Sequence, residues 1–308
     1  MTAPVAQTIG ITRRFGAKTA VDSLDLTIPG GVVYGLLGPN GSGKTTVMRL
    51  LTGLLNPNAG RAEVLGRPLP GNAEALKSQI GYMTQGFTHY RDLTVLGNLR
   101  FVAGIHDLPA KRARRRIAEL LETYDLTARA TDLAGALSSG QRQRLALAAT
   151  VIHEPQLLFL DEPTAAVDPE TRRNFGERLF DLVEAGTTMI VSTHLMDEAE
   201  RCHRIAILDL DRKCADGTPQ DLMAQVEGRV VEVTGDDLRQ IGRALKAQTE
   251  IASVAQIGAR LRVLVSETVE DAEAAVTTAL GGRADASARA VRPNLEDVFV
   301  LATRVTAR

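Results

Sequence analysis

Short runs of apolar and β-branched residues alternate along most of the chain with segments whose apolar residues recur at helical spacing. The short runs predict buried strands at residues 32–37, 157–160, 189–192 and 204–208. A glycine-rich turn follows the first of them, and a helix is expected over Lys44–Leu55, ended near Asn56 and Pro57. Buried strands alternating with helices are typical of a largely parallel sheet covered by helices, so the fold class expected is α/β.

The pattern becomes mainly helical in the middle of the chain. Apolar residues recur at helical spacing over Leu93–Ala103, Lys111–Tyr124 and Gln141–Ile152. These segments predict a helical subdomain, about residues 86–152, inserted into the sheet domain. The basic run Lys111–Arg116 continues into an amphipathic segment, which favours a solvated face of a surface helix over a nucleic-acid or lipid patch.

Beyond Leu222 the pattern changes again. It predicts a strand, a helix, two strands, a helix and a strand, over residues 229–234, 236–247, 251–257, 260–265, 270–280 and 288–291. That order resembles a small α+β unit of the ferredoxin-like kind. Two domains are therefore expected, residues 1–221 and 222–308.

Composition agrees with a globular protein, since 44% of the 308 residues are hydrophobic and 24% are charged. The formal net charge is -1, which provides no overall field to attract nucleic acid or anionic lipid. The longest nearly apolar runs fall far short of the ~20 residues of a spanning helix, and residues 1–10 carry no secretion signal. Cys202 and Cys214 are too far apart for a CxxC motif, which fits a reducing compartment. A cytoplasmic location is expected.

The turn after the first buried strand has the pattern GxxxxGK[ST], between a strand and a helix where a phosphate-binding loop belongs. Its glycines let successive N–H groups, and the positive end of the next helix, face phosphates. Lys44 adds a cation, and the hydroxyl of Thr45 is expected to bind Mg²⁺. The nucleotide-binding residues expected here are Gly38, Pro39, Asn40, Gly41, Ser42, Gly43, Lys44, Thr45 and Thr46.

Two carboxylates end the buried strand at 157–160. The carboxyl edge of an open α/β sheet is where ligands bind, so Asp161 is expected to hold Mg²⁺ through water. Glu162 is the candidate base that orients the attacking water, and the alternative is that it only caps a helix beginning near Pro163. His194 follows another buried strand and is singled out by that position.

With these motifs, the chain over Ile9 to about Leu222 resembles the nucleotide-binding subunit of an ATP-binding-cassette (ABC) transporter. The family's remaining motifs are matched in order by Phe15 (the adenine-stacking aromatic), Gln85 (Q-loop), Leu137-Ser138-Ser139-Gly140-Gln141 (signature), Ala165–Asp168 (D-loop) and His194 (switch histidine). Taken alone, the signature segment would be a serine N-cap on a surface helix.

The resemblance implies two copies arranged head to tail, with ATP and Mg²⁺ enclosed between the phosphate-binding loop of one copy and the signature of the other. It implies catalytic roles for Lys44, Gln85, Glu162 and His194, nucleotide contacts from Ser138, Ser139, Gly140, Gln141 and Asp168, and Mg²⁺ binding by Thr45, Gln85 and Asp161. Two positions depart from the family pattern. Ser139 replaces the commoner second glycine of the signature, and Gly97 stands where an acidic residue is usual.

The segment Pro293–Phe299 resembles the ending of drug-resistance-type subunits of the daunorubicin exporter kind, which favours export. The expected protein is a cytoplasmic ATPase, peripheral on the inner face of the membrane, that drives a separate multi-spanning permease. Two alternatives are a soluble ABC-type ATPase acting on nucleic acid or ribosomes, and a regulatory subunit that binds ATP without turnover. A single phosphate-binding loop and the lack of a basic, aromatic-interleaved surface oppose the first, and the intact catalytic positions oppose the second.

Overall fold

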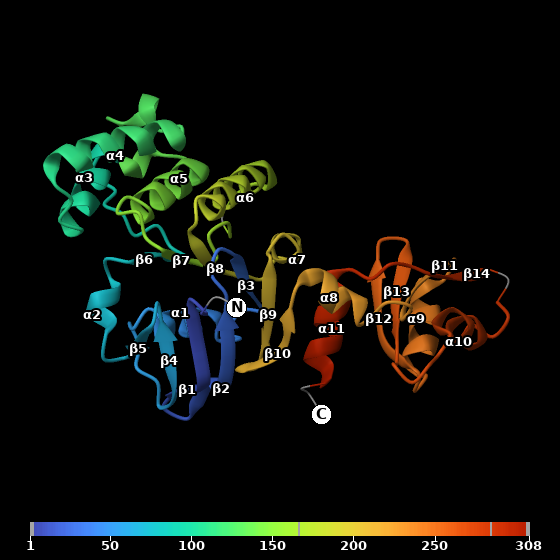
Figure 1. Ribbon diagram of the computed structural model, residues 1–308. Coiled ribbons are helices and arrows are strands. Elements are labelled where there is room, and N and C mark those ends of the chain that lie inside the picture. Colours follow the sequence, from blue (N-terminus) through green and yellow to red (C-terminus); the bar gives the residue numbers. More distant parts are fainter. Residues whose placement is uncertain (1–2, 166, 284, 306–308) are drawn as a thin grey trace. The chain divides into compact units, whose positions relative to one another are not determined.

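The central element is a six-stranded sheet with strand order β10-β9-β3-β8-β7-β6 (Figure 1). The computed structural model describes residues 3–165, 167–283 and 285–305. The strands are β3 (Val33–Leu37), β6 (Ile80–Met83), β7 (Leu157–Asp161), β8 (Thr188–Thr193), β9 (Arg204–Asp209) and β10 (Arg212–Gly217). β3 pairs in parallel with β8 and β9, and β7 pairs in parallel with β6 and β8. All four predicted strands are present, and every residue of β3, β7 and β8 is buried.

A second sheet, antiparallel and four-stranded, was not expected from the sequence. Its order is β2-β1-β4-β5, with β1 (Ala6–Phe15), β2 (Lys18–Ile28), β4 (Ala59–Val64) and β5 (Arg67–Leu69). β1 and β2 form a hairpin whose last pair is Phe15 with Lys18. The hairpin therefore presents Phe15 at the tip of the sheet.

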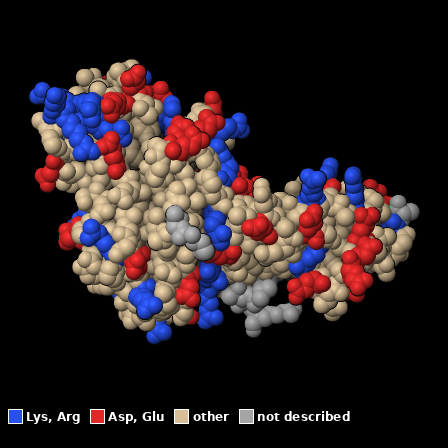
Figure 2. Space-filling model, viewed as in Figure 1, with Lys and Arg blue, Asp and Glu red and all other residues tan. Residues whose placement is uncertain are grey.

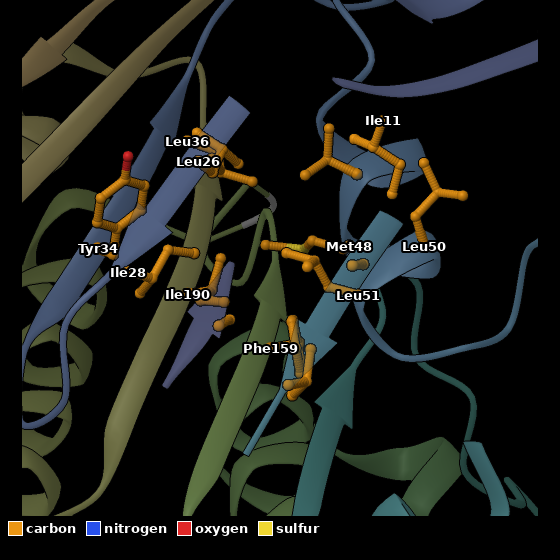
Figure 3. Close-up of a cluster of buried hydrophobic side chains, with 14 of the residues drawn as sticks. Ile11, Leu26, Ile28, Tyr34, Leu36, Met48, Leu50, Leu51, Phe159 and Ile190 are labelled. Carbon is orange, nitrogen blue, oxygen red and sulfur yellow. The ribbon is translucent and has the colours of Figure 1, made fainter. Parts of the chain in front are cut away.

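The core of this part of the chain lies between the two sheets and around α1 (Lys44–Leu51) (Figure 3). The apolar side of α1 contributes Met48, Leu50 and Leu51, which are at most 2% exposed. They pack with buried residues of both sheets, among them Ile11, Leu26, Leu36, Phe159 and Ile190. Burial on this scale contributes about 1.5–3 kcal/mol per large side chain, so the helix that follows the phosphate-binding loop is held rigidly.

The predicted end of this helix at Leu55 is wrong. The helix ends at Leu51, with Thr52 as its C-cap and Gly53 at φ 72°. A side chain at Gly53 would place its Cβ 2.5 Å from the Cβ of Ala73. Glycine in the left-handed conformation is a common helix terminator, and it acts here before Asn56 and Pro57 are reached.

Most of the segment between β6 and β7 is helical, with α3 (Val95–Ile105), α4 (Ala110–Thr123) and α5 (Ser139–Thr150). The helix α6 (Pro169–Glu184) follows β7. Four short helices complete this part of the chain: α2 (Ala73–Leu76), η1 (Thr127–Arg129), η2 (Ala134–Ala136) and α7 (Met196–Ala199). α4 buries Ile117, Leu120 and Leu121, while most of its basic side chains lie on the surface (Figure 2). Arg112 forms an ion pair with Glu154. The basic run is thus the solvated face of an amphipathic helix, as predicted.

Contacts divide the chain into two compact units, Met1–Lys213 and Cys214–Arg308. The second unit contains α8 (Pro219–Ala224), β11 (Val230–Gly235), α9 (Leu238–Lys246), β12 (Ile251–Ile257), β13 (Arg260–Val265), α10 (Ala272–Ala279), β14 (Ala286–Ala290) and α11 (Leu295–Val305). Its strands form an antiparallel sheet of order β12-β13-β11-β14 with its own buried apolar cluster. Across the described residues of both units, none of the helices has the length and apolar character needed to span a membrane.

Candidate functional site

The phosphate-binding loop is a tight turn between β3 and α1. Gly43, the N-cap of α1, has φ 94°, a conformation that residues with a Cβ rarely adopt. A Cβ at this position would also lie 2.3 Å from the carbonyl oxygen of Ala20. A glycine is required here because both the backbone angle and the space exclude a side chain.

Lys44 lies beneath this loop and is 5% exposed. Its Nζ donates hydrogen bonds to the carbonyl oxygens of Gly38 at 2.7 Å and Pro39 at 3.1 Å. It also lies 3.4 Å from Oε1 of Glu162. Burial lowers the pKa of Lys44, while Glu162 acts in the opposite direction. The ammonium group is therefore held at the loop by the loop's own carbonyls and by the predicted catalytic base.

Asp161, at the carboxyl end of β7, is surrounded by hydroxyl groups. Thr45 Oγ1 donates to its Oδ1 at 3.1 Å, and Ser192 Oγ donates to the same oxygen at 2.6 Å. Tyr82 OH donates to Oδ2 at 3.5 Å, and burial, with a smaller contribution from Asp161, raises the pKa of Tyr82. Thr45 and Asp161 are thus brought together as predicted. Ser192 was missed, although the parallel register pairs it directly with Asp161.

Glu162 is the point at which the predicted catalytic side chains meet. Gln85 Nε2 donates to Glu162 Oε2 at 3.0 Å, and His194 Nδ1 lies 3.4 Å from the same oxygen. Lys44 approaches the other oxygen. The carboxylate is 9% exposed, so these charges and dipoles act in a partly dehydrated environment.

Glu162 does not cap a helix. The next helix, α6, begins at Pro169, and its N-cap is Asp168. Glu162 instead has φ 46°, and its backbone N–H donates to Ser192 Oγ at 2.9 Å. The alternative interpretation as a capping residue is therefore wrong.

A pocket of about 450 Å³ joins these groups to the tip of the β1–β2 hairpin. Its lining residues are Phe15, Lys18, Ala20, Asn40, Gly41, Gly43, Lys44, Thr45, Thr46, Gln85 and Glu162. Phe15 is 46% exposed, and the guanidinium of Arg13 lies 4.7 Å from its ring centroid. The Oγ of Ser42 is buried and has no hydrogen-bond partner among the described residues. Ser42 lies in the phosphate-binding loop but is not among the lining residues, whereas a pocket of this size with an open aromatic ring and a buried cation fits a nucleotide polyphosphate.

Two lining residues, Lys18 and Ala20, were not predicted. Both lie on β2, and Lys18 is opposite Phe15 in the hairpin. The sequence signal for this hairpin was missed, so its contribution to the pocket was missed with it.

The signature residues lie in a different pocket, of about 560 Å³, together with Asp168. Ser138 is the N-cap of α5 and forms a reciprocal capping box with Gln141. Asp168 accepts hydrogen bonds from the N–H and the hydroxyl of Thr171, and these bonds lower the pKa of Asp168. None of the described residues lines both pockets. Within one chain, the structure therefore does not bring the signature to the phosphate-binding loop.

A family model described as "ABC transporter" matches residues 21–165, which contain the phosphate-binding loop, the signature and Glu162. The daunorubicin resistance ATP-binding protein DrrA3 of Streptomyces coeruleorubidus is 37% identical over 300 residues, 94% of this chain and 93% of that protein. The chain belongs to the ABC transporter ATP-binding family. As an ABC ATP-binding subunit, it binds nucleotide.

Other relatives of this ABC protein carry export-related names. The Nod factor export ATP-binding protein I of Cupriavidus metallidurans is 36% identical over 97% of both chains. The probable multidrug ABC transporter ATP-binding protein YbhF of Escherichia coli is 43% identical over 215 residues, which are 70% of this chain and 37% of YbhF. The chain thus spans well under half of the length of that relative.

Solved structures support the same fold. An ATP-binding subunit of an ABC transporter superposes with a TM-score of 0.66 at 27% identity, covering 72% of this chain and 92% of its own. The subunit cbiO1 of Clostridium perfringens superposes with a TM-score of 0.67 at 23% identity, covering 80% and 96%. The P-loop fold of ABC ATPases predicted from the sequence is therefore confirmed.

Proposed function

We propose that this protein is the Mg²⁺-dependent ATPase subunit of an export system. The observation that carries the proposal is the position of Glu162, whose carboxylate contacts Lys44, Gln85 and His194 at the edge of the phosphate-binding pocket. In this proposal Glu162 accepts a proton from the attacking water, and Lys44 and His194 bind the γ-phosphate region. Gln85 orients this water next to the bound phosphate. Phe15 stacks on the adenine.

Thr45 and Asp161 are the residues that would hold Mg²⁺, with Gln85 as a further oxygen ligand. The hydroxyl and carboxylate oxygens at this point are the donors that Mg²⁺ prefers, and the contact between Thr45 and Asp161 places them side by side. Mg²⁺ usually keeps several water ligands and also binds substrate phosphates, so these side chains would supply only part of its coordination. When bound, Mg²⁺ neutralises charge on the phosphates.

The second part of the proposal is a head-to-tail dimer. Ser138, Gly140 and Gln141 lie at the start of α5, and the positive end of the helix dipole there favours an anion. Because the signature pocket is separate from the phosphate-binding pocket, we infer that the signature and Asp168 contact the nucleotide of a second copy. Ser139 lines the same pocket, and we propose that its added Cβ and hydroxyl impose a modest cost on that approach.

We propose that the subunit is cytoplasmic and attaches to the inner face of the membrane through a multi-spanning permease. Residues 86–152 form the helical subdomain that receives the permease's cytoplasmic helices, with Gly97 altering that contact. Residues 222–308 are an accessory domain of the ferredoxin-like class, supported by the antiparallel order of its four strands. The cargo proposed is a drug or another hydrophobic molecule, from the names of the relatives.

Isolation of the full chain from detergent extract of its own cells tests this function. We expect a hydrophobic multi-spanning protein to co-purify, and ATP hydrolysis by the complex to require Mg²⁺. Glu162→Gln should still recover the permease but lose hydrolysis. Recovery of ribosomes or nucleic acid in place of a membrane protein would instead support the soluble ABC-type ATPase.

A further inference from the structure

The carboxylate of Glu198, which lies outside the nucleotide pocket, accepts hydrogen bonds from the loop that follows Glu162 and from the turn at His194. Glu198 lies in the short helix α7 and is 17% exposed. One of its oxygens accepts a hydrogen bond from Thr193 Oγ1 at 2.6 Å, and the other accepts one from Thr164 Oγ1. Thr193 is 2% exposed and Thr164 is 4% exposed. Buried hydrogen bonds to a charged acceptor are among the stronger ones in proteins, so this carboxylate holds the two hydroxyls firmly.

The two threonines adjoin the proposed catalytic residues. Thr193 directly precedes His194, and its Oγ1 also accepts a hydrogen bond from the N–H of Leu195 at 3.0 Å. The hydroxyl of Thr193 therefore links the residues on both sides of His194, and Glu198 fixes the position of this hydroxyl. Thr164 lies two residues after Glu162, and its hydrogen bond to Glu198 connects the loop after Glu162 to α7.

Glu162 needs such support because its backbone is strained. Its φ of 46° is in the left-handed region, which costs a residue with a Cβ about 1–2 kcal/mol. Strained residues of this kind persist only where neighbouring contacts hold them. On one side the N–H of Glu162 is held by Ser192 Oγ. On the other side, the hydroxyl of Thr164 is held by Glu198.

The same carboxylate also contacts α6. Arg172 Nε lies 3.6 Å from Glu198 Oε1, and the Nη1 of this arginine lies 3.6 Å from Asp197 Oδ2. Arg172 is in the first turns of α6, which begins directly after Asp168. Glu198 thus meets three segments: the loop after Glu162, the turn at His194 and the helix that follows the D-loop.

We propose that Glu198 is a positioning residue for ATP hydrolysis, which aligns Glu162 and His194 through the hydroxyls of Thr164 and Thr193. Glu198 does not line the nucleotide pocket, so its removal should leave nucleotide affinity intact. The side chains that act on the water and the γ-phosphate would then be misaligned. The inference rests on the proposed roles of Glu162 and His194.

The test compares Glu198→Ala with Asp197→Asn in the purified full chain. Asp197 is the matched control, since it lies next to Glu198, faces the same arginine and is 69% exposed. We expect Glu198→Ala to lower kcat on the order of tenfold with KM for ATP changed less than about twofold. Asp197→Asn should leave both values unchanged. An equal kcat for the two variants, or a change confined to KM, would overturn the proposal.

Replacements of the threonines keep the test decisive if Glu198→Ala fails to fold. Thr164→Val and Thr193→Val remove the hydroxyls, and Thr164→Ser and Thr193→Ser retain them. We expect the valine variants to lose kcat on the order of tenfold and the serine variants to stay within about twofold of the natural protein. Equal losses in valine and serine variants would contradict a role through the hydroxyls.

Glu162→Gln separates this inference from the function on which it rests. If Glu162→Gln hydrolyses ATP at the natural rate, the proposed role of Glu162 is wrong. If Glu162→Gln is inactive while Glu198→Ala and both valine variants are fully active, the role of Glu162 stands and that of Glu198 is refuted.

Discussion

Lys44 Nζ lies 3.4 Å from Oε1 of Glu162, in a contact between two side chains that are 5% and 9% exposed. Both groups are expected to act on the same phosphate region, one as a cation and the other as a base. Without nucleotide they neutralise each other, which lowers the free energy cost of burying both charges. Bound γ-phosphate would pair with the ammonium group of Lys44 in place of Glu162. The Glu162 carboxylate would then be available to interact with the attacking water.

Glu162→Gln should abolish turnover while leaving ATP binding intact. The amide cannot accept the proton from water, and general bases of this kind contribute about 10²–10⁴-fold to the rate. Phosphate release measures the rate, and a fluorescent ATP analogue measures affinity. Glu170→Gln, which removes an exposed carboxylate in the first turn of α6, should hydrolyse ATP normally. A Glu162→Gln protein as active as this control would refute the assigned base.

Gly43→Ala should damage both stability and nucleotide binding. The added Cβ would lie 2.3 Å from Ala20 O, at a φ of 94°. Gly31→Ala is the control, because Gly31 also has positive φ, 70°, but has nothing within 4 Å of an added Cβ. We expect a loss of about 1 kcal/mol for the control and about 3 kcal/mol for Gly43→Ala in urea unfolding. ATP affinity should fall only for Gly43→Ala. Equal losses would show that the contact with Ala20 is unimportant.

Phe15→Leu should weaken ATP binding without lowering the maximal rate. Base stacking on an aromatic ring contributes about 1–3 kcal/mol, or about 5- to 150-fold in Kd. Phe15→Tyr keeps the ring and should bind normally. Phe101→Leu changes another exposed phenylalanine, on α3, and should also bind normally. Unchanged affinity in Phe15→Leu would place the adenine elsewhere.

Acid should destabilise the protein through His153. Its ring stacks on that of His106 with centroids 3.7 Å apart, and its Nε2 lies 2.9 Å from Ile80 O. Burial, helped by His106, lowers the pKa of His153 from 6.5 to about 4. Because the unfolded state binds the proton more tightly, the neutral ring stabilises the fold above about pH 6.5, and this contribution disappears as pH falls toward 4.

Urea unfolding of the natural protein and of His153→Gln measures this effect. Between about pH 7 and pH 4.5, the natural protein should lose on the order of 2–3 kcal/mol more than His153→Gln. His106 remains in both proteins, so its own titration contributes to both. Parallel pH dependences in the two proteins would show that His153 titrates normally.

The sequence predicted those parts of the fold and site that depend on local pattern. The buried strands were found because β3, β7 and β8 are apolar runs, and the phosphate-binding loop was found because its glycines and Lys44 adjoin one of them. The β1–β2 hairpin was missed because its residues alternate only partly between buried and exposed, and several register shifts interrupt the pairing.

The contacts of Ser192 and Glu198 could not be predicted from the sequence, for a different reason. Ser192 meets Asp161 only because β7 and β8 pair in a particular register, and Glu198 meets Thr164 only through the folding of α7 against the ends of these strands. Neither residue stands in a sequence motif that indicates a partner. Tertiary structure, and not local pattern, determines both contacts.

The central claim is that two copies of this chain enclose ATP between the phosphate-binding loop of one and Ser138 of the other. Light scattering on Glu162→Gln with saturating Mg-ATP tests it most directly, with Ser138→Arg added as the control that blocks the facing surface. The account predicts twice the monomer mass for Glu162→Gln with ATP, and the monomer mass both without ATP and with Ser138→Arg added. An ATP-bound Glu162→Gln protein that stays monomeric, alone and with its permease, would contradict it.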